Sequence, residues 1–251
     1  MRLRCRFKLE EKSLPVDYRR VFISFIKKSF SEYDKSLYKT WYSGRALSKP
    51  FGFSVRLVNP RFERDMMTLG KSEVDFYFTT GDLKLGIQAY NAFLKQKGNC
   101  EHILNKNTME LTGVFLVKEK GIYSNNVTIR FNSPLVVRDH NPNTGEDYYY
   151  SYGTEGFNEV LKRTLREQIS SNHEITGKML DEFTLTGIYP KKTVVRFYEQ
   201  QIECSIGTYK MYGHPALIEH LYKNAMGSRR SSGFGVFEIR WKEVSHNYGR
   251  K

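Results

Sequence analysis

Residues 2–9 alternate between apolar and basic side chains. The apolar ones are Leu3, Cys5, Phe7 and Leu9, and the basic ones are Arg2, Arg4, Arg6 and Lys8. A period of two predicts a β-strand with one buried face and one charged face. Because four like charges in a row repel one another, the basic face favours contact with an anion; an ordinary solvated face is the alternative.

The next hundred residues predict two helices and three further strands. The first helix begins near Asp17, which fits an N-cap, and buries a stripe of apolar residues at helical spacing, namely Val21, Phe22, Phe25 and Ile26. Strands are expected near residues 51–58, 74–79 and 111–118, and a second helix near 82–95. With the opening strand, this order is β-α-β-β-α-β, the order of a ferredoxin-like unit.

The second half repeats this order after a linker at residues 121–126. The expected elements are a strand at 127–131, a helix at 154–170, strands near 182–188, 193–198 and 202–212, a helix from Pro215 to Gly227 and a last strand at 234–241. The polar, tyrosine-rich stretch 140–152 is expected to be a mobile loop. The predicted fold class is therefore α+β, with two tandem ferredoxin-like (RRM-like) units at residues 1–120 and 121–251.

The charge balance points to a polyanionic partner. The chain has 251 residues, and its 40 Lys and Arg against 27 Asp and Glu give a net charge of +13. Such a field concentrates nucleic acid at the surface, although an anionic protein would also fit. Aromatic residues make up 14% of the chain, which favours a binder of single strands or loops, because unpaired bases stack on rings.

Several functional classes are excluded by the sequence. No run approaches the roughly 20 apolar residues that a membrane span needs, and the cations near the N-terminus interrupt any signal-peptide core. Cys5, Cys100 and Cys204 are far apart in sequence and form no CxxC pair, which fits a reducing cytoplasm. His214 and His220, six residues apart on one predicted helix, cannot share a metal ion. We therefore expect a cytoplasmic protein without metal or cofactor.

The most specific segment is rich in glycine, serine and arginine and lies between the last helix and the last strand. Its members are Gly227, Ser228, Arg229, Arg230, Ser231, Ser232, Gly233 and Gly235. Backbone amides, hydroxyls and guanidiniums all suit phosphate oxygens, so these residues are candidates for RNA binding. The segment is neither a P-loop nor a GxGxxG motif, and a plain turn with solvated arginines is the alternative.

Residues 225–239, Ala-Met-Gly-Ser-Arg-Arg-Ser-Ser-Gly-Phe-Gly-Val-Phe-Glu-Ile, closely resemble the glycine-rich signature of the CRISPR repeat-processing endoribonucleases (the "Cas six" family of the RAMP superfamily). Residues 49–55 resemble the family's KxFTFS-like strand, and residues 133–138 also fit. The resemblance implies cleavage of CRISPR repeat RNA without a metal, by attack of a 2′-hydroxyl on the adjacent phosphate. It also implies a prokaryotic cytoplasm and contacts with other CRISPR-associated proteins of an effector complex.

The catalytic residues carry over only in part. Many members place a histidine just before the KxFTFS-like strand, whereas this sequence has no histidine between Phe30 and Phe51. Lys49 carries over directly. Members without the histidine resemble this one and use lysines with an arginine of the glycine-rich loop, which implies roles for Lys27 or Lys28 with Arg229 or Arg230. The expected catalytic set is Lys49, Tyr42, Lys28 and His140.

Two members of that set rest on weaker grounds. Tyr42 is the ring hydroxyl nearest to the place of the missing histidine. His140 follows a predicted strand and can serve as a substitute acid or base, with an ordinary loop histidine as the alternative. The missing histidine also keeps open a second function, that of a non-cleaving RNA-binding RAMP subunit of a CRISPR ribonucleoprotein. An unrelated double RRM-like protein is disfavoured, because the sequence has no RNP-type strand.

Overall fold

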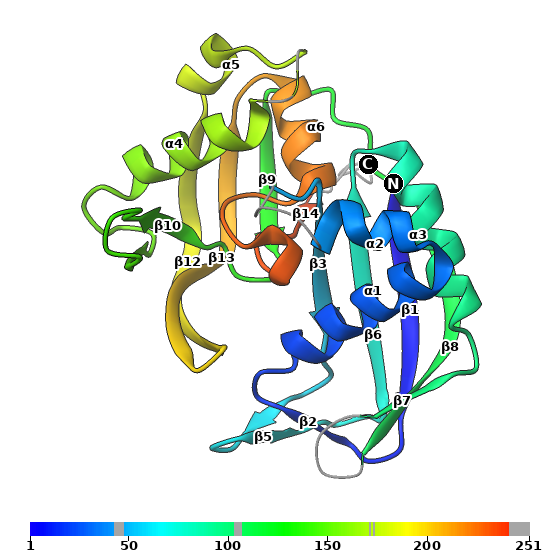
Figure 1. The fold of residues 1–251 in the computed structure, drawn as a ribbon. Coiled ribbons are helices and arrows are strands. Elements are labelled where there is room, and N and C mark those ends of the chain that lie inside the picture. Colours follow the sequence, from blue (N-terminus) through cyan, green and yellow to red (C-terminus); the bar gives the residue numbers. More distant parts are fainter. Residues whose placement is uncertain (43–47, 103–106, 171, 173, 241–251) are drawn as a thin grey trace, which may run out of the picture.

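Two antiparallel sheets, each covered by helices on one face, form the two halves of the molecule (Figure 1). The computed structural model describes residues 1–42, 48–102, 107–170, 172 and 174–240. The first sheet is built from the N-terminal half of the chain, and its last strand ends at Val117. The second sheet is built from the C-terminal half, and its first strand begins at Asn126.

The first sheet has the strand order β3-β6-β1-β8-β7, and all neighbouring strands are antiparallel. The strands are β1 (Arg2–Leu9), β3 (Phe51–Arg56), β6 (Glu73–Thr80), β7 (Cys100–His102) and β8 (Thr108–Val117). Without the short edge strand β7, this is the ferredoxin-like order 2-3-1-4. The predicted order of elements is confirmed for this unit.

Helices α1 (Arg19–Tyr33) and α3 (Leu83–Lys95) cover one face of the first sheet. The alternation in β1 is confirmed, since its four apolar side chains are buried. Phenylalanine rings join the layers: Phe25 of α1 lies 5.0 Å from Phe7 and 5.2 Å from Phe93, measured between ring centres. These contacts bury the aromatic residues that helical and strand spacing assign to the core.

The predicted N-cap of α1 is wrong. The N-cap residue is Tyr18, with no side-chain cap. The Asp17 carboxylate instead accepts a hydrogen bond of 3.0 Å from the backbone N–H of Tyr198, at the tip of a hairpin in the second unit. An aspartate just before a helix can cap that helix or accept a hydrogen bond from a distant residue. The local sequence is the same in both cases, so it could not distinguish the two roles.

Besides the edge strand β7, two further additions to the first unit were not predicted. Helix α2 (Lys35–Tyr42) follows α1, and a small sheet of β2 (Ser13–Pro15), β5 (Met66–Thr68) and β4 (Arg61–Phe62) lies at the lower end of the unit in Figure 1. No helix in the described part of the chain is long and apolar enough to cross a membrane.

The second sheet has the order β12-β13-β9-β14 and is also ferredoxin-like. Its strands are β9 (Asn126–Phe131), β12 (Thr184–Phe197), β13 (Gln200–Tyr212) and β14 (Phe237–Arg240), and its helices are α4 (Phe157–Ile169), α5 (Gly177–Asp181) and α6 (Pro215–Asn224). The two strands predicted between residues 182 and 198 are wrong, because β12 is one strand. Pro190 is accommodated because β12 is an edge strand with an irregularity between Gly187 and Tyr189.

The mobile loop predicted at residues 140–152 is also wrong. Strands β10 (Val137–His140) and β11 (Asp147–Tyr150) form a hairpin here, and Arg138 pairs with Tyr149. Charged residues and tyrosines made the segment look like a loop, although tyrosine favours strands and the Asn-Pro-Asn-Thr-Gly sequence between them favours a turn.

Arg2 joins the two units. Its side chain is only 5% exposed and forms an ion pair with Glu238 of β14. The guanidinium also donates to the carbonyl oxygens of Tyr222 (3.1 Å) and Phe237 (2.9 Å) and lies 3.8 Å from the centre of the Tyr222 ring. Because a buried cation needs such partners, Arg2 has a structural role. Its guanidinium is buried and is therefore not available for the RNA contact that was expected of it.

Candidate functional site

The glycine-rich loop lies between the β10–β11 hairpin and β3, where the two units meet (Figure 1). It contains a short 3-10 turn (Arg230–Ser232). The segment before β10 supports it: the N–H of Ser228 donates to the carbonyl oxygen of Val136 at 2.8 Å, and that of Gly235 to the carbonyl oxygen of Pro134 at 2.8 Å. The loop is therefore fixed to the second unit by backbone hydrogen bonds.

Gly235 requires its glycine. Its φ is +74°, and a Cβ built there would lie 1.9 Å from the carbonyl oxygen of Met226. Any other residue would force the loop to move. The N–H groups of Ser228, Ser232, Gly233 and Gly235 are used within the protein, so most of the amides expected to bind phosphate are occupied. The side chains of Arg229, Ser231 and Ser232 remain partly exposed.

Arg230 is an anchor under the loop. Its side chain is 7% exposed and donates to the carbonyl oxygen of Asn224 (2.9 Å) and to Oγ of Ser48 (2.7 Å). Burial lowers the pKa of Arg230 to about 10, so it stays protonated near neutrality. Direct RNA contact was expected of Arg230, but the structure places it between the loop and the residue that precedes Lys49.

Two lysines share one aromatic ring beside this anchor. Nζ of Lys49 lies 4.6 Å, and Nζ of Lys27 lies 5.4 Å, from the centre of the Tyr42 ring. Burial lowers the pKa of Lys49, and the positive charge of Lys27 lowers it further. A lysine in such surroundings gives up its proton closer to neutral pH, so Lys49 is suited to proton transfer.

Tyr42 contributes its ring to this site. Its hydroxyl is buried and has no hydrogen-bond partner among the described residues. Burial raises the pKa of Tyr42, and the neighbouring Tyr38 and Tyr198 raise it further. The phenol therefore stays neutral, and its apolar surroundings suit a platform for the two ammonium groups better than an acid or base.

The first helix supplies Lys27 to this cluster. Lys27 is half-buried against Tyr42, whereas Lys28, the lysine of α1 in the expected catalytic set, is exposed. Both lysines lie outside the buried apolar stripe of α1, so the sequence pattern did not show which of them joins the site. The position of α2, which carries Tyr42, places Lys27 there.

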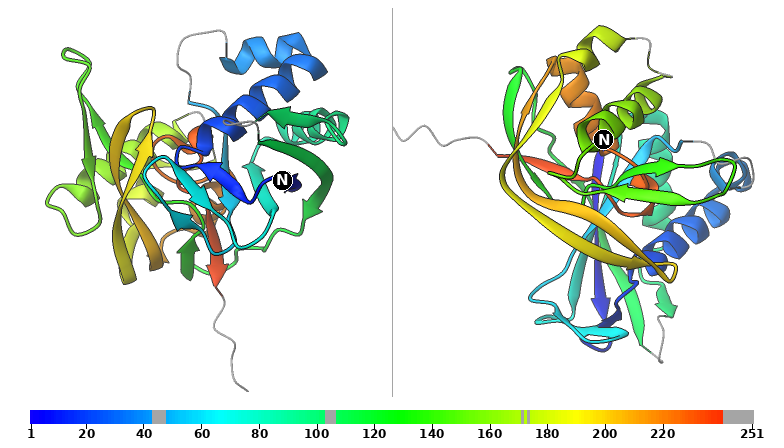
Figure 2. Two further views of the ribbon diagram at one scale, coloured as in Figure 1. Left: turned by 90° about the horizontal axis from the view of Figure 1, so that it is seen from below. Right: turned by 90° about the vertical axis from the view of Figure 1, so that its left-hand side faces the viewer.

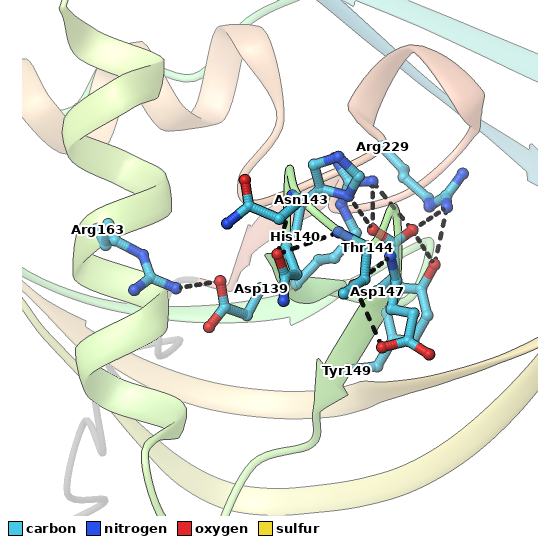
Figure 3. Close-up of polar contacts among 11 residues, drawn as sticks. Asp139, His140, Asn143, Thr144, Asp147, Tyr149, Arg163 and Arg229 are labelled. Atoms are coloured by element: carbon cyan, nitrogen blue, oxygen red, sulfur yellow. Dashed lines mark hydrogen bonds and ion pairs between the residues drawn. The ribbon is translucent and has the colours of Figure 1, made fainter.

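His140 lies in a network of polar contacts centred on Asp147 (Figure 3). Nδ1 of His140 is 2.7 Å from Asp147, which also accepts hydrogen bonds from Arg138 (2.9 and 3.0 Å), Arg229 (2.9 Å) and the hydroxyl of Tyr149 (3.0 Å). Burial alone would raise the pKa of Asp147, but the hydrogen bonds and the charge of Arg138 lower it to about 2. Asp147 thus links the hairpin to the glycine-rich loop through Arg229.

A basic cleft lies between the two units, and sequence reasoning missed it. Its volume is about 1140 Å³, and its lining includes five arginines and one carboxylate, that of Glu238. Arg56, Arg130 and Arg240 are exposed there and form no ion pair within the described part of the chain. Tyr77 and the largely exposed Phe62 also line the cleft. Arginines interleaved with aromatic rings suit a single-stranded nucleic acid.

The other basic side chains of β1 lie on the side of the first sheet that faces the cleft, opposite the helices. Arg4 is paired with Tyr77 of the cleft, and its guanidinium lies 4.8 Å from the ring centre of Phe115. Arg6 is held by Asp75 at 3.0 Å, and Lys8 is exposed. These three side chains extend the charge of the cleft along the sheet. Within the described residues, no three His, Cys, Asp or Glu side chains are grouped closely enough to hold a metal ion.

The chain thus combines two ferredoxin-like units, a C-terminal glycine-rich loop and a basic cleft between the units. The model of the family "CRISPR associated protein Cas6, C-terminal" matches residues 117–239. This match shows that residues 117–239 form a Cas6 C-terminal domain, and solved Cas6 structures share the fold of the whole chain. No curated protein matches the sequence.

Solved structures share the fold over nearly the whole chain. The product of a Cas6-related gene from Pyrococcus furiosus has a TM-score of 0.83 and 16% identity, over 97% of this chain and 99% of that one. A RAMP protein described as binding different RNA substrates has a TM-score of 0.81 and 18% identity, over 96% and 100%. A Cas6 product complex has a TM-score of 0.71 and 13% identity, over 96% and 100%. At these identities, the likeness shows the fold.

Proposed function

We propose that this protein is an endoribonuclease that cuts CRISPR repeat RNA without a metal ion and so produces mature CRISPR RNA. The Cas6 C-terminal domain at residues 117–239, together with the fold shared with solved Cas6 structures, supports CRISPR-related RNA processing or binding. The observation that carries the cleavage proposal is the pair of lysines on the Tyr42 ring, because it provides a lysine of lowered pKa beside the glycine-rich loop.

The reaction is a transesterification within the RNA. The 2′-oxygen attacks the neighbouring phosphorus, its proton passes to a base, the bond from phosphorus to the 5′-oxygen breaks, and an acid protonates that oxygen. The products are a 2′,3′-cyclic phosphate and a 5′-hydroxyl. Such a reaction needs one or two proton-transfer groups and cations around the doubly charged phosphorane.

The structure offers candidate residues for both the proton transfer and the positive charge that the reaction requires. Lys49 transfers the proton, since its pKa is the one lowered by burial and by Lys27. Lys27 supplies positive charge, and the partly exposed Ser231 and Ser232 offer hydroxyl donors. Arg230 keeps Ser48, and with it the start of β3, against the loop. A mispositioned lysine would lose much of its effect, because proton transfer requires hydrogen-bond reach.

RNA binding is assigned to the cleft and to the adjacent face of β1. The exposed guanidiniums of Arg56, Arg130 and Arg240 suit phosphates, and Tyr77 and Phe62 suit unpaired bases. The RNA partner is precursor CRISPR RNA in a prokaryotic cytoplasm, and other CRISPR-associated proteins are further candidate partners.

The second candidate is a non-cleaving RNA-binding subunit of a CRISPR ribonucleoprotein. The absence of a histidine between Phe30 and Phe51 favours it, because a lysine is a slower acid or base at neutral pH than a histidine. The two candidates share the RNA and differ only in the chemical step.

Incubating the protein with its repeat RNA in excess EDTA distinguishes the two candidate functions. We expect cleavage at one position, at the same rate as in magnesium, and fragments that end in a cyclic phosphate and a 5′-hydroxyl. A requirement for magnesium, or a 3′-hydroxyl product, would contradict the transesterification. Stable binding without any cleavage would favour the subunit.

A further inference from the structure

One face of the β10–β11 hairpin gathers basic side chains around a single carboxylate. Arg138 and His140 on β10 and Tyr149 on β11 reach Asp147 within the hairpin, and Arg229 reaches it from the glycine-rich loop (Figure 3). All of these side chains share one face, because the register pairs Arg138 with Tyr149 and His140 with Asp147. The face therefore belongs to both the hairpin and the loop.

The basic groups outnumber the acidic ones on this face. Two guanidiniums and one carboxylate leave one positive charge, and a protonated His140 would add a second. The side chains of His140, Arg138 and Arg229 are 48%, 31% and 23% exposed, so an incoming anion can reach them. Asp147 is 13% exposed and its oxygens already accept from four groups, which limits its repulsion of an anion.

Asp147 also decides what His140 can do. Nδ1 of His140 carries a hydrogen if it donates to Asp147, so in a neutral ring Nε2 is an acceptor. An acceptor nitrogen repels a phosphate oxygen. Once the ring is protonated, Nε2 becomes a donor that points away from Asp147, and none of the described residues occupies it. Among the side chains of proteins, histidine is the one whose charge most readily responds to pH in the physiological range.

We propose that this face is a second RNA subsite, which binds a phosphodiester group through Arg138, Arg229 and protonated His140. The ligand class rests on the proposed function, since RNA is the polyanion that the protein is proposed to bind. Asp147 is the positioning residue, because it holds the three basic side chains in place before RNA arrives. RNA binding at this face should therefore strengthen as the pH falls.

The other charged groups near His140 do not reverse this expectation. On the opposite face of the hairpin, Asp139 is paired with Arg163 of α4 at 2.7 Å. Glu146, next to Asp147 in the turn, accepts from the hydroxyl of Thr144 at 3.2 Å. Both carboxylates therefore have partners of their own.

The test measures the affinity for a non-cleavable repeat RNA, with a 2′-deoxy residue at the cleavage position, at pH 8 and pH 5.5 and constant ionic strength. The wild type should bind roughly five- to tenfold more tightly at pH 5.5, the size expected for one hydrogen bond to a charged group at a partly exposed site. His140→Gln should lose this gain, and at pH 5.5 its slope of log K against log salt should be shallower by about 0.7.

Two further variants serve as controls. His140→Lys carries a permanent charge, so it should bind tightly at both pH values. His214→Asn changes a histidine outside the cluster and keeps a good N-cap on α6; it should behave as the wild type does. Thermal melting checks that each variant is folded.

A His140→Gln variant with the wild-type gain on acidification would overturn the subsite. So would unchanged binding combined with lost cleavage at saturating RNA, because His140 would then act in the chemical step. The result does not depend on cleavage by the wild type: tight, pH-dependent binding without cleavage would refute the proposed nuclease and retain the subsite. No RNA binding by the wild type would refute both.

Discussion

Replacing Lys49 by alanine should lower the single-turnover cleavage rate by roughly a hundredfold or more, with repeat RNA bound about as tightly as before. The reason is the position of Lys49 on the Tyr42 ring, where burial and Lys27 lower its pKa. A proton-transfer group acts mainly in the transition state, so its loss affects the rate more than the affinity. The measurement is single-turnover kinetics at saturating protein, together with the affinity for non-cleavable RNA.

Two variants show whether charge alone accounts for the effect. Lys49→Arg keeps the positive charge but cannot release a proton near neutrality, so it should remain about as slow as the alanine variant. Lys39→Ala removes an exposed lysine of α2 and should cut at the wild-type rate. If Lys49→Ala retained full activity while His140→Ala abolished cleavage at saturating RNA, the acid–base centre would lie in the second unit and the assignment would be wrong.

The double variant Arg130→Ala/Arg240→Ala should weaken RNA binding by roughly tenfold or more near physiological salt. It should also flatten log K against log salt by about 1.4, or about 0.7 for each phosphate of a single strand that the protein no longer neutralises. Both side chains are exposed on neighbouring strands of the second sheet and line the cleft without an ion pair among the described residues. Their guanidiniums are therefore available to phosphates. Salt titrations of the binding constant measure the effect.

The matched control removes two arginines elsewhere. Arg163 and Arg166 are exposed on α4 and paired with Asp139 and Asp181; changing both to alanine should leave the slope nearly unchanged. Arg4→Ala/Arg6→Ala tests the face of β1, and we expect the slope to fall by up to about one unit for each arginine that binds a phosphate, with less from Arg6 because Asp75 already holds it. Equal slopes for all three variants would mean that net charge, and not the cleft, binds the RNA.

The order of elements could be predicted because it depends on local patterns. The alternation in β1 and the apolar spacing of α1 reflect which side chains are buried. In contrast, the β10–β11 hairpin has two strands of four residues, and its mixture of charged residues and tyrosines has no clear period. Its turn sequence, Asn-Pro-Asn-Thr-Gly, was the available signal.

The site was less predictable, because it depends on how the units meet. Arg2 and Arg4 occupy equivalent basic positions in the alternation of β1, yet Arg2 is buried against Glu238 and Arg4 is partly exposed. Similarly, Arg229 and Arg230 are adjacent, but one reaches the hairpin and the other lies under the loop. A glycine-rich sequence shows that a tight loop is needed, and only the packed structure shows which of its side chains remain available for RNA.

The surroundings of the lysine pair come from distant parts of the chain. The long β12–β13 hairpin extends across to the start of α1 (Figure 2), where Tyr198 donates to Asp17. Arg20 of α1 lies 4.8 Å from the ring centre of Tyr198, and the same tyrosine raises the pKa of Tyr42. Residues from both units therefore surround the lysine pair, and no spacing within one segment indicates this.

In the proposed reaction the RNA itself supplies the nucleophile, and Lys49 transfers a proton. The most direct test compares, in EDTA, the normal repeat RNA with one that lacks a single 2′-hydroxyl at the cleavage position. We predict that the normal RNA is cut, that the 2′-deoxy RNA binds equally well, and that the latter is not cut at all. Cleavage of the 2′-deoxy RNA at the same position would contradict the account, because the nucleophile would then come from elsewhere.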